Sequence, residues 1–262
     1  MILLGKGAPL TAPGFTNVCT QLGVGAAEIW ALVFTETDYP YSGFWADRRP
    51  QILYEQHIFS RLTHGHYDKQ APDISNPRPG NYGASGDNQY IRLRKAMDLD
   101  EGAAVQSASW GIGQVLGENY HAVGASSPEV FVGKMLASED EQLLAAANEI
   151  LSRKKVNVAG FLATHDWPNF AYYYNGSNYA ASGYDKHLAS WYAKFAAGVL
   201  PDIRMRAAQI YLMYLGYNPN VIDGVWGPRT ASAVSAFQKD MGDPVTGEID
   251  DPTLQQLINA NA

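Results

Sequence analysis

The stretch GAAEIWALVFTET, residues 25–37, carries apolar side chains at the spacing of a helix. Apolar residues that recur three or four positions apart lie on one face of an α-helix. Here they are Ala26, Ile29, Trp30, Val33 and Phe34. The sequence therefore predicts a strongly apolar helix, and this helix ends at a single acid, Glu36.

Most of the surrounding residues 1–199 are also predicted to be helical, so the expected fold class is mainly α. The further predicted helices are 89–98, 101–107, 111–120, 127–135, 138–153, 157–164, 167–174 and 183–197. Alternating apolar residues predict a small β element within residues 44–59. Residues 63–89 hold Gly, Pro, Asn, Asp and Ser at the density of turns. A loop of this length is more often functional than idle, so we expect it to border a substrate cleft.

Residues 200–262 form a second predicted unit. It follows the stretch Gly198-Val199-Leu200-Pro201, in which Gly and then Pro stop the preceding helix. Asp251 is expected to cap the last helix of this unit. The three helices predicted here are 204–215, 229–241 and 252–259. The chain thus divides into a domain of residues 1–199 and a three-helix domain, and the short connection with its proline predicts that they lie close together.

The composition argues against several classes of protein. The chain has 262 residues and a formal net charge of −7, without a patch of basic residues. This charge argues against nucleic-acid binding and against electrostatic attachment to an anionic membrane. Cys19 is the only cysteine, which excludes an intramolecular disulfide and a thiolate metal cluster. His64 and His66 have no further ligand at helix spacing, so neither a metal nor another cofactor is expected.

Glu36 is the first candidate for acid chemistry. The negative end of the helix dipole and the aromatic side chains that follow both disfavour a charged carboxylate, and this raises the pKa of a carboxyl group. A carboxylic acid that stays protonated near neutral pH can protonate the leaving oxygen of a glycoside. The alternative is an ordinary surface acid at a helix end.

Glu55 and His57 are a second candidate pair. In residues 52–59 the apolar positions alternate, which leaves Glu55 and His57 together on the opposite face of a strand. They fit a second acid and its hydrogen-bonding partner. A solvated strand face fits the same pattern equally well.

Several motifs, in the expected order, resemble segments of lysozyme-related enzymes. Ser109-Trp110-Gly111-Ile112-Gly113-Gln114-Val115 and Tyr173-Tyr174-Asn175-Gly176 resemble signatures of goose-type lysozymes and soluble lytic transglycosylases. Glu36 falls where those families keep the catalytic acid. Arg49-Pro50 with residues 53–59, together with Glu118-Asn119-Tyr120, resembles phage-type N-acetylmuramidases. The resemblance covers about residues 15–195 and implies a lysozyme-like helical catalytic domain.

This resemblance implies a role for each matched residue. Glu36 would be the general acid, and Glu55 or Asp47 would hold the attacking water. Gln114 and Asn175 would recognise sugar amides. The residues expected to bind substrate are Gln114, Tyr174, Asn175, Tyr120, His57 and Trp110. For Tyr174 the expected role is a ring contact or a hydroxyl hydrogen bond, with core packing as the alternative.

Residues 200–262 resemble a peptidoglycan-binding domain. The matching segments are Leu215-Gly216-Tyr217, Asp223-Gly224-Val225-Trp226-Gly227-Pro228-Arg229-Thr230 and Ala233-Val234-Ser235-Ala236-Phe237-Gln238. Most of this pattern serves the fold, with Phe237 in the core. The candidates for the ligand face are Tyr217, Trp226 and Arg229.

Together the two resemblances imply a peptidoglycan hydrolase of the endolysin type. It would cleave the β-1,4 bond from N-acetylmuramic acid to N-acetylglucosamine, with inversion, as a monomer whose partner is bacterial peptidoglycan. One alternative is a lytic transglycosylase that uses the same acid and forms an anhydro product. Another is a non-catalytic wall-binding or tail protein.

The opening residues MILLGKGAPL bear on where such an enzyme acts. Only three consecutive aliphatic residues follow Met1, too few for the apolar region of a secretory signal. We therefore expect synthesis in a host cytoplasm and release to the cell wall through a membrane lesion made by another protein. A secreted antibacterial effector is the alternative.

Overall fold

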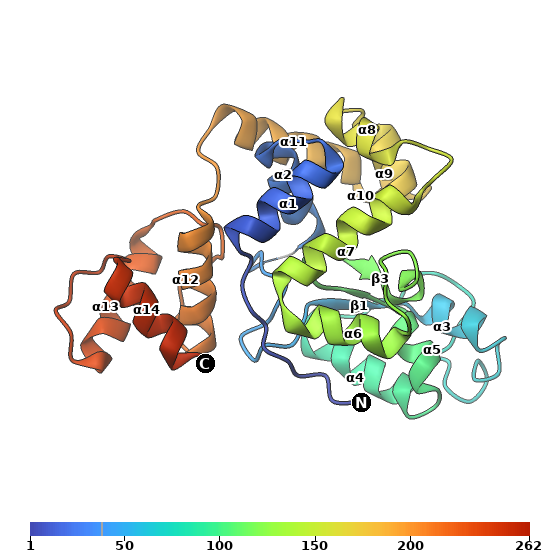
Figure 1. Cartoon of the computed structure of the whole chain (residues 1–262). Helices are drawn as coiled ribbons and strands as arrows, with labels where there is room; N and C mark the ends of the chain where they lie inside the picture. Colours follow the sequence, from blue (N-terminus) through green and yellow to red (C-terminus); the bar gives the residue numbers. More distant parts are fainter. Residues whose placement is uncertain (38) are drawn as a thin grey trace.

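The computed structural model describes residues 1–37 and 39–262, and it consists of two lobes and a smaller C-terminal domain (Figure 1). The upper lobe in Figure 1 contains α1 (Ala12–Leu22), α2 (Ala26–Glu36), α8 (Val158–Ala163), α9 (Trp167–Tyr174), α10 (Tyr179–Ser182) and α11 (Tyr184–Ala197). The lower lobe contains a small sheet with α3 (Gln56–Leu62), α4 (Asp87–Met97), α5 (Glu101–Gln106) and α6 (Pro128–Ala137). Helix α7 (Glu139–Ser152) joins the lobes and contributes side chains to both cores. The predicted mainly α fold class is confirmed.

Helix α2 lies at the centre of the upper lobe. Every residue from Ile29 to Phe34 is buried, so this helix is enclosed on all sides rather than amphipathic. Helix α11 packs along it, and the ring centroid of Phe34 lies 4.9 Å from that of Trp191 and 5.2 Å from that of Phe195. These rings hold the end of α2 in place, and with it Glu36.

The sheet of the lower lobe has three antiparallel strands in the order β1 (Ile52–Tyr54), β2 (Ala108–Trp110) and β3 (Val115–Leu116). The predicted β element is therefore present, but its strand ends at Tyr54 and α3 begins at Gln56. Tyr54 and Ile58 are both buried and lie four positions apart, a spacing that fits one face of a helix as well as one face of a strand, so the short apolar run is ambiguous. His57 consequently lies on a helix and not on the strand face predicted for it.

One predicted helix is absent, and one helix of the structure was not predicted. Residues 111–120 form no helix but two 3₁₀ turns, η1 (Gly111–Gly113) and η2 (Gly117–Asn119), on either side of β3. Gly111 has φ +69°, and a Cβ there would lie 2.3 Å from the Gln142 side chain, so the backbone is shaped by a tertiary contact. Helix α1 was not predicted, although Thr11 caps it and Gly23 ends it at φ 66°.

In the described part of the chain no single helix is long and apolar enough to cross a membrane. Helices α1 and α2 reach the required length only together, and they are bent by 104° at the break between them.

The C-terminal domain has the three predicted helices, α12 (Ile203–Tyr214), α13 (Pro228–Met241) and α14 (Asp251–Ala260). Their core includes Phe237, as predicted. Asp250, and not Asp251, is the N-cap of α14, because its side chain accepts a hydrogen bond from the Thr253 amide. Residues 198–202 connect this domain to α11.

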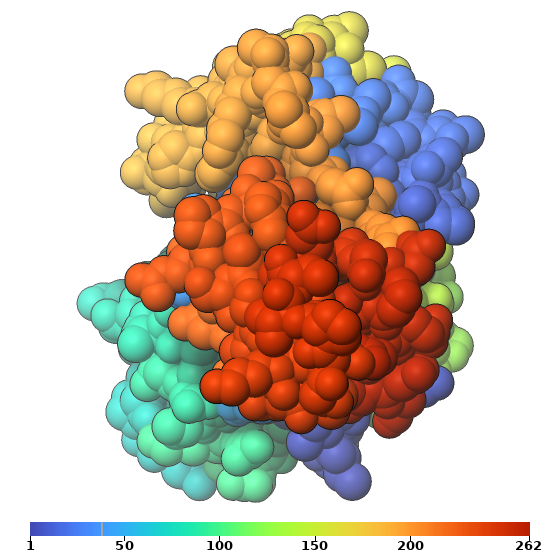
Figure 2. Space-filling view, turned by 90° about the vertical axis from the view of Figure 1, so that its left-hand side faces the viewer, coloured from blue at the N-terminus to red at the C-terminus, as the bar shows by residue number. Residues whose placement is uncertain are grey.

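A buried ion pair joins the C-terminal domain to the lobes. Both Nη atoms of Arg206, on α12, donate to the carboxylate of Glu139, at the start of α7, and both side chains are almost fully buried. Arg206 also donates to the Tyr41 carbonyl at 3.0 Å, and the Tyr214 hydroxyl donates to the Gly7 carbonyl at 2.7 Å. Figure 2 views the molecule from this side, with the C-terminal domain in front of the junction of the lobes. The predicted closeness of the two parts is confirmed.

Candidate active site

A cleft of about 1320 Å³ opens between the two lobes. Its walls come from the end of α2, the sheet, the C-terminal end of α7 and the chain from α9 to α10. Segments far apart in the sequence bring five predicted site residues to this one cleft, namely Glu36, Glu55, Gln114, Tyr174 and Asn175. Tyr82, Gly83 and Ser85 also line it, so the predicted loop does border the cleft.

Glu36 is the last residue of α2 and lies largely enclosed where the helix reaches the cleft. The Tyr184 hydroxyl, from α11, donates a hydrogen bond to its Oε1 atom. Burial raises the pKa of Glu36 to about 8, and the negative charge of Glu149 adds to this effect, whereas the hydrogen bond from Tyr184 opposes it. Glu36 is therefore a carboxylic acid that holds its proton at neutral pH.

Glu149 on α7 is a cleft residue that was not predicted from the sequence. It is 6% exposed, accepts a 2.7 Å hydrogen bond from the Asn119 side chain and lies 3.4 Å from Arg153 Nη2. Burial raises its pKa to about 7, against the lowering effects of Arg153 and Asn119. Its sequence signal was an acid three residues after Ala146 and next to Ile150, on the apolar face of a predicted helix.

Glu55 faces the cleft from the lower lobe, just before α3. Burial raises its pKa to about 7, and the neighbouring carboxylate of Glu118 adds to the shift. His57 Nδ1 lies 3.8 Å from Glu55 Oε2, which is too far for a hydrogen bond. His57 is not part of the cleft lining, and burial together with the positive charge of Arg61 lowers its pKa. Its predicted contact with substrate stays a prediction.

The side chains of Gln114 and Tyr174 are partly committed to the backbone. Gln114 Nε2 donates to the Gly111 carbonyl at 2.8 Å, so its amide oxygen is the group left to face the cleft. The Tyr174 hydroxyl donates to the Gly113 carbonyl at 2.8 Å, and its ring stacks on Phe170. Tyr174 can therefore offer a ring face, whereas Asn175 is exposed at the rim of the cleft.

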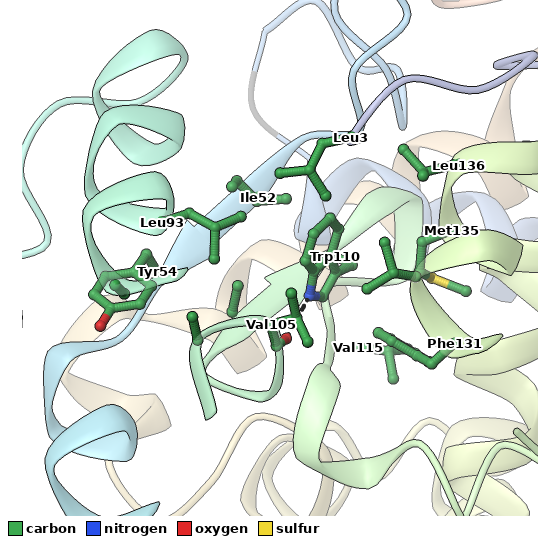
Figure 3. Packing of buried hydrophobic residues seen from close by; sticks show 14 of the residues in the cluster. Leu3, Ile52, Tyr54, Leu93, Val105, Trp110, Val115, Phe131, Met135 and Leu136 are labelled. Atoms are coloured by element: carbon green, nitrogen blue, oxygen red, sulfur yellow. Dashed lines mark hydrogen bonds between the residues drawn. The ribbon is translucent and has the colours of Figure 1, made fainter. Parts of the chain in front are cut away.

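Besides His57, three predicted site residues of the catalytic domain lie outside the cleft lining. Trp110 is 0% exposed, and Figure 3 shows it packed in the lower-lobe core with its indole nitrogen donating to the Val105 carbonyl. Asp47 is paired with Arg49, which also binds Asp87, away from the cleft. Tyr120 packs partly buried against the lower-lobe core. The direction of these side chains follows from strand register and from partners distant in sequence, which the motifs alone do not encode.

The three candidates on the C-terminal domain differ in exposure. Trp226, in the turn before α13, is 45% exposed, and Arg229, the second residue of α13, is also exposed. Tyr217 is half-buried, with its hydroxyl donating to Asp240 at 2.9 Å and its ring against Phe237. Trp226 and Arg229 are thus the free groups, while Tyr217 braces the fold.

The chemistry of the cleft is that of carboxyl groups. Within residues 1–37 and 39–262, no group of three or more His, Cys, Asp or Glu side chains is placed to hold a metal ion. A protonated carboxyl on one wall and titratable carboxyls around it suit acid–base cleavage of a glycosidic bond. A two-lobed helical fold with a small sheet and such a cleft defines the lysozyme-like class.

Comparison with known families agrees with this class. The N-acetylmuramidase family matches residues 25–196, which is more than half of the chain, and a peptidoglycan-binding domain family matches residues 203–257. The chain belongs to the N-acetylmuramidase family. The predicted resemblance is confirmed, and at the level of the family so is the prediction of a peptidoglycan hydrolase.

Individual relatives are consistent with the family assignment. The crystal structure of the Burkholderia AP3 phage endolysin matches with a TM-score of 0.63 and 31% identity, over 71% of this chain and 70% of that one. The localization factor PodJL of Caulobacter vibrioides is 39% identical over 62 residues. That match covers 24% of this chain and only 6% of PodJL.

Proposed function

We propose that this chain hydrolyses the β-1,4 bond from N-acetylmuramic acid to N-acetylglucosamine in bacterial peptidoglycan, with Glu36 as the general acid. The observation that carries the proposal is the protonated carboxyl of Glu36 on the wall of a cleft of about 1320 Å³ between the lobes. The family match and the endolysin relative support the same substrate.

The hydrogen bonds of Glu36 suggest how its proton is delivered. Because the Tyr184 hydroxyl donates to Oε1, that atom is the carbonyl oxygen of the neutral acid, and Oε2 carries the proton. Oε2 then protonates the glycosidic oxygen as the bond to the anomeric carbon breaks. Glu55, on the other lobe, accepts a proton from the water that attacks this carbon, which yields inversion.

The products distinguish hydrolysis from its nearest alternative. A transglycosylase would use the same acid, but the muramyl 6-hydroxyl would attack in place of water. Mass spectrometry of digested muropeptides is expected to show reducing ends, whose mass exceeds that of anhydro ends by one water. Anhydro ends would contradict hydrolysis, and an inactive protein in a peptidoglycan gel would contradict catalysis altogether.

The pH profile of cleavage follows from the two carboxyl groups. Glu55 must lose its proton, with a pKa of about 7, and Glu36 must keep its proton, with a pKa of about 8. We expect kcat/KM on soluble strands to peak between about pH 7 and 8 and to fall about tenfold per pH unit well outside this range. Initial rates between pH 5 and 10 measure this profile.

Glu149→Gln checks the assignment of the alkaline limb. The Glu149 carboxylate raises the pKa of Glu36, so the amide should move the alkaline limb to lower pH and leave the peak rate similar. An alkaline limb that stays in place would mean that another group controls it.

We also propose that the C-terminal domain binds peptidoglycan through Trp226 and Arg229. Both side chains are exposed and lie three positions apart in the sequence, and an exposed tryptophan can stack on a sugar ring. A domain bound to the wall raises the local concentration of the cleft at its substrate.

Trp226→Ala is expected to weaken binding to purified sacculi by roughly tenfold and to slow their digestion, because a hot-spot aromatic carries much of a binding energy. Cleavage of soluble strands should stay at the wild-type rate, since the cleft is untouched. Met241→Ala, at a similarly exposed apolar residue of the same domain, is the matched control. Unchanged binding of the Trp226→Ala protein would contradict this ligand face.

A further inference from the structure

The charges around the cleft are strongly one-sided. Four glutamates line it, namely Glu36, Glu55, Glu118 and Glu149, and Arg153 is the single cationic side chain in the lining formed by the described residues. Arg153 begins the short basic run Arg153-Lys154-Lys155, which the sequence analysis did not count as a basic patch. Because ionised carboxylates repel an anion, an anionic ligand is favoured beside this arginine rather than elsewhere in the cleft.

Arg153 lies directly after the last turn of α7 with its guanidinium available. Its side chain is 46% exposed, and its one hydrogen bond among the described residues is a 3.4 Å contact with Glu149. Asn119 already supplies the shorter bond to the same carboxylate oxygen, at 2.7 Å. Most of the five donors of Arg153 are therefore free to meet a ligand in the cleft.

Arg153 lies in the cleft that also holds the proposed general acid, Glu36. Glu149 contacts Arg153 at 3.4 Å, while its charge raises the pKa of Glu36. A group held by Arg153 therefore lies in the same cleft as the sugar that Glu36 protonates. The planar guanidinium matches a carboxylate with two parallel hydrogen bonds, which lysine cannot do.

We infer that Arg153 binds a carboxylate on the lactyl arm of the muramic acid and thereby selects strands that carry it. This inference rests on the proposed function, in which muramic acid occupies the cleft. The lactyl arm is what distinguishes muramic acid from N-acetylglucosamine. It presents a carboxylate either at its own end or on the peptide attached there.

The test compares solubilised peptidoglycan strands before and after their carboxylates are converted to methylamides. For the wild-type chain we expect kcat/KM to be about 3- to 10-fold higher on the untreated strands. Arg153→Gln should bring this ratio close to 1, and Arg153→Lys should give an intermediate ratio. Lys154→Gln is the matched control, because Lys154 is exposed outside the lining and should leave the ratio unchanged.

Strands whose peptides have been removed by an amidase identify the source of the carboxylate. On peptide-bearing strands the lactyl carboxyl is an amide and the peptide supplies the carboxylates, whereas the amidase frees the lactyl carboxylate. An effect of Arg153→Gln found mainly on the amidase-treated strands assigns the lactyl carboxylate, and an effect found mainly on the peptide-bearing strands assigns the peptide. A ratio near 1 for the wild type, or the same ratio in wild type and Arg153→Gln, overturns the inference. Binding of both strand preparations is measured in parallel. A wild-type chain that prefers untreated strands but cleaves neither would contradict the proposed function and still decide the role of Arg153.

Discussion

Glu36→Gln is expected to lower the rate of peptidoglycan cleavage by at least about 10²- to 10⁴-fold. The amide keeps the size of the side chain and an oxygen that can accept the hydrogen bond from Tyr184, but it has no proton acidic enough to give to the leaving oxygen. Digestion of purified sacculi and a peptidoglycan gel measure the loss. Circular dichroism and the unfolding midpoint establish that the fold is unchanged.

The control for this change is Glu129→Gln. Glu129 is an exposed acid of the catalytic domain, at the start of α6, and lies outside the cleft. The same chemical substitution there should leave the rate at the wild-type level. Near wild-type clearing by the Glu36→Gln protein would show that another group supplies the proton.

The stability of the Glu36→Gln protein provides an independent check on the raised pKa. Between the ordinary carboxyl pKa of 4.5 and the folded-state value of about 8, the folded wild-type chain binds more protons at Glu36 than the unfolded chain does. The contribution of Glu36 to stability is therefore fully present below 4.5 and is lost as the pH rises through 8. The amide has no such dependence, so the variant should gain stability relative to wild type from pH 5 to pH 8.

The parts of the fold that could be predicted are those whose signals are local. Helices α2, α11 and α13 show apolar periodicity along their own sequence, and the glycines that follow α13 and precede α11 mark their limits. The segment of residues 111–120 was wrongly predicted because its backbone depends on Gln142, whose side chain accepts from the Ile112 amide at 2.8 Å. A contact 30 positions away leaves no periodic signal.

The site was predictable where a motif carries it. Glu36, Gln114 and Tyr174 come from matched segments, and the structure brings them to one cleft. Glu149 and Arg153 belong to no motif, and only the packing of α7 between the lobes gives them their place. Their roles, like that of Glu36, remain predictions for the experiments above.

Arg206→Met is expected to lower the free energy of unfolding by about 3–5 kcal/mol near pH 7.5, because it leaves a buried carboxylate without its cation. Burial disfavours the charge of Glu139, but Arg206 and the amides of Gly43 and Leu10 together hold the pKa of Glu139 below its ordinary value. Without Arg206, burial dominates and the pKa rises. The deficit should therefore be largest above pH 7 and smaller at pH 5, where Glu139 takes up a proton.

Urea unfolding of the full chain at both pH values measures this effect, and Arg206→Met/Glu139→Gln separates charge from packing. The Gly43 and Leu10 amides donate to different oxygens of Glu139, so the amide oxygen of the double variant can accept from only one of them, and we expect it to recover part of the stability at pH 7.5. A single Arg206→Met variant whose free energy of unfolding is within about 1 kcal/mol of wild type would mean that the pair contributes little.

The ion pair also affects the activity expected of a catalytic domain without its C-terminal domain. Cutting the chain at residue 199 removes Arg206 and strands the Glu139 charge in the catalytic domain, so a slower truncated enzyme would report lost stability as well as lost wall binding.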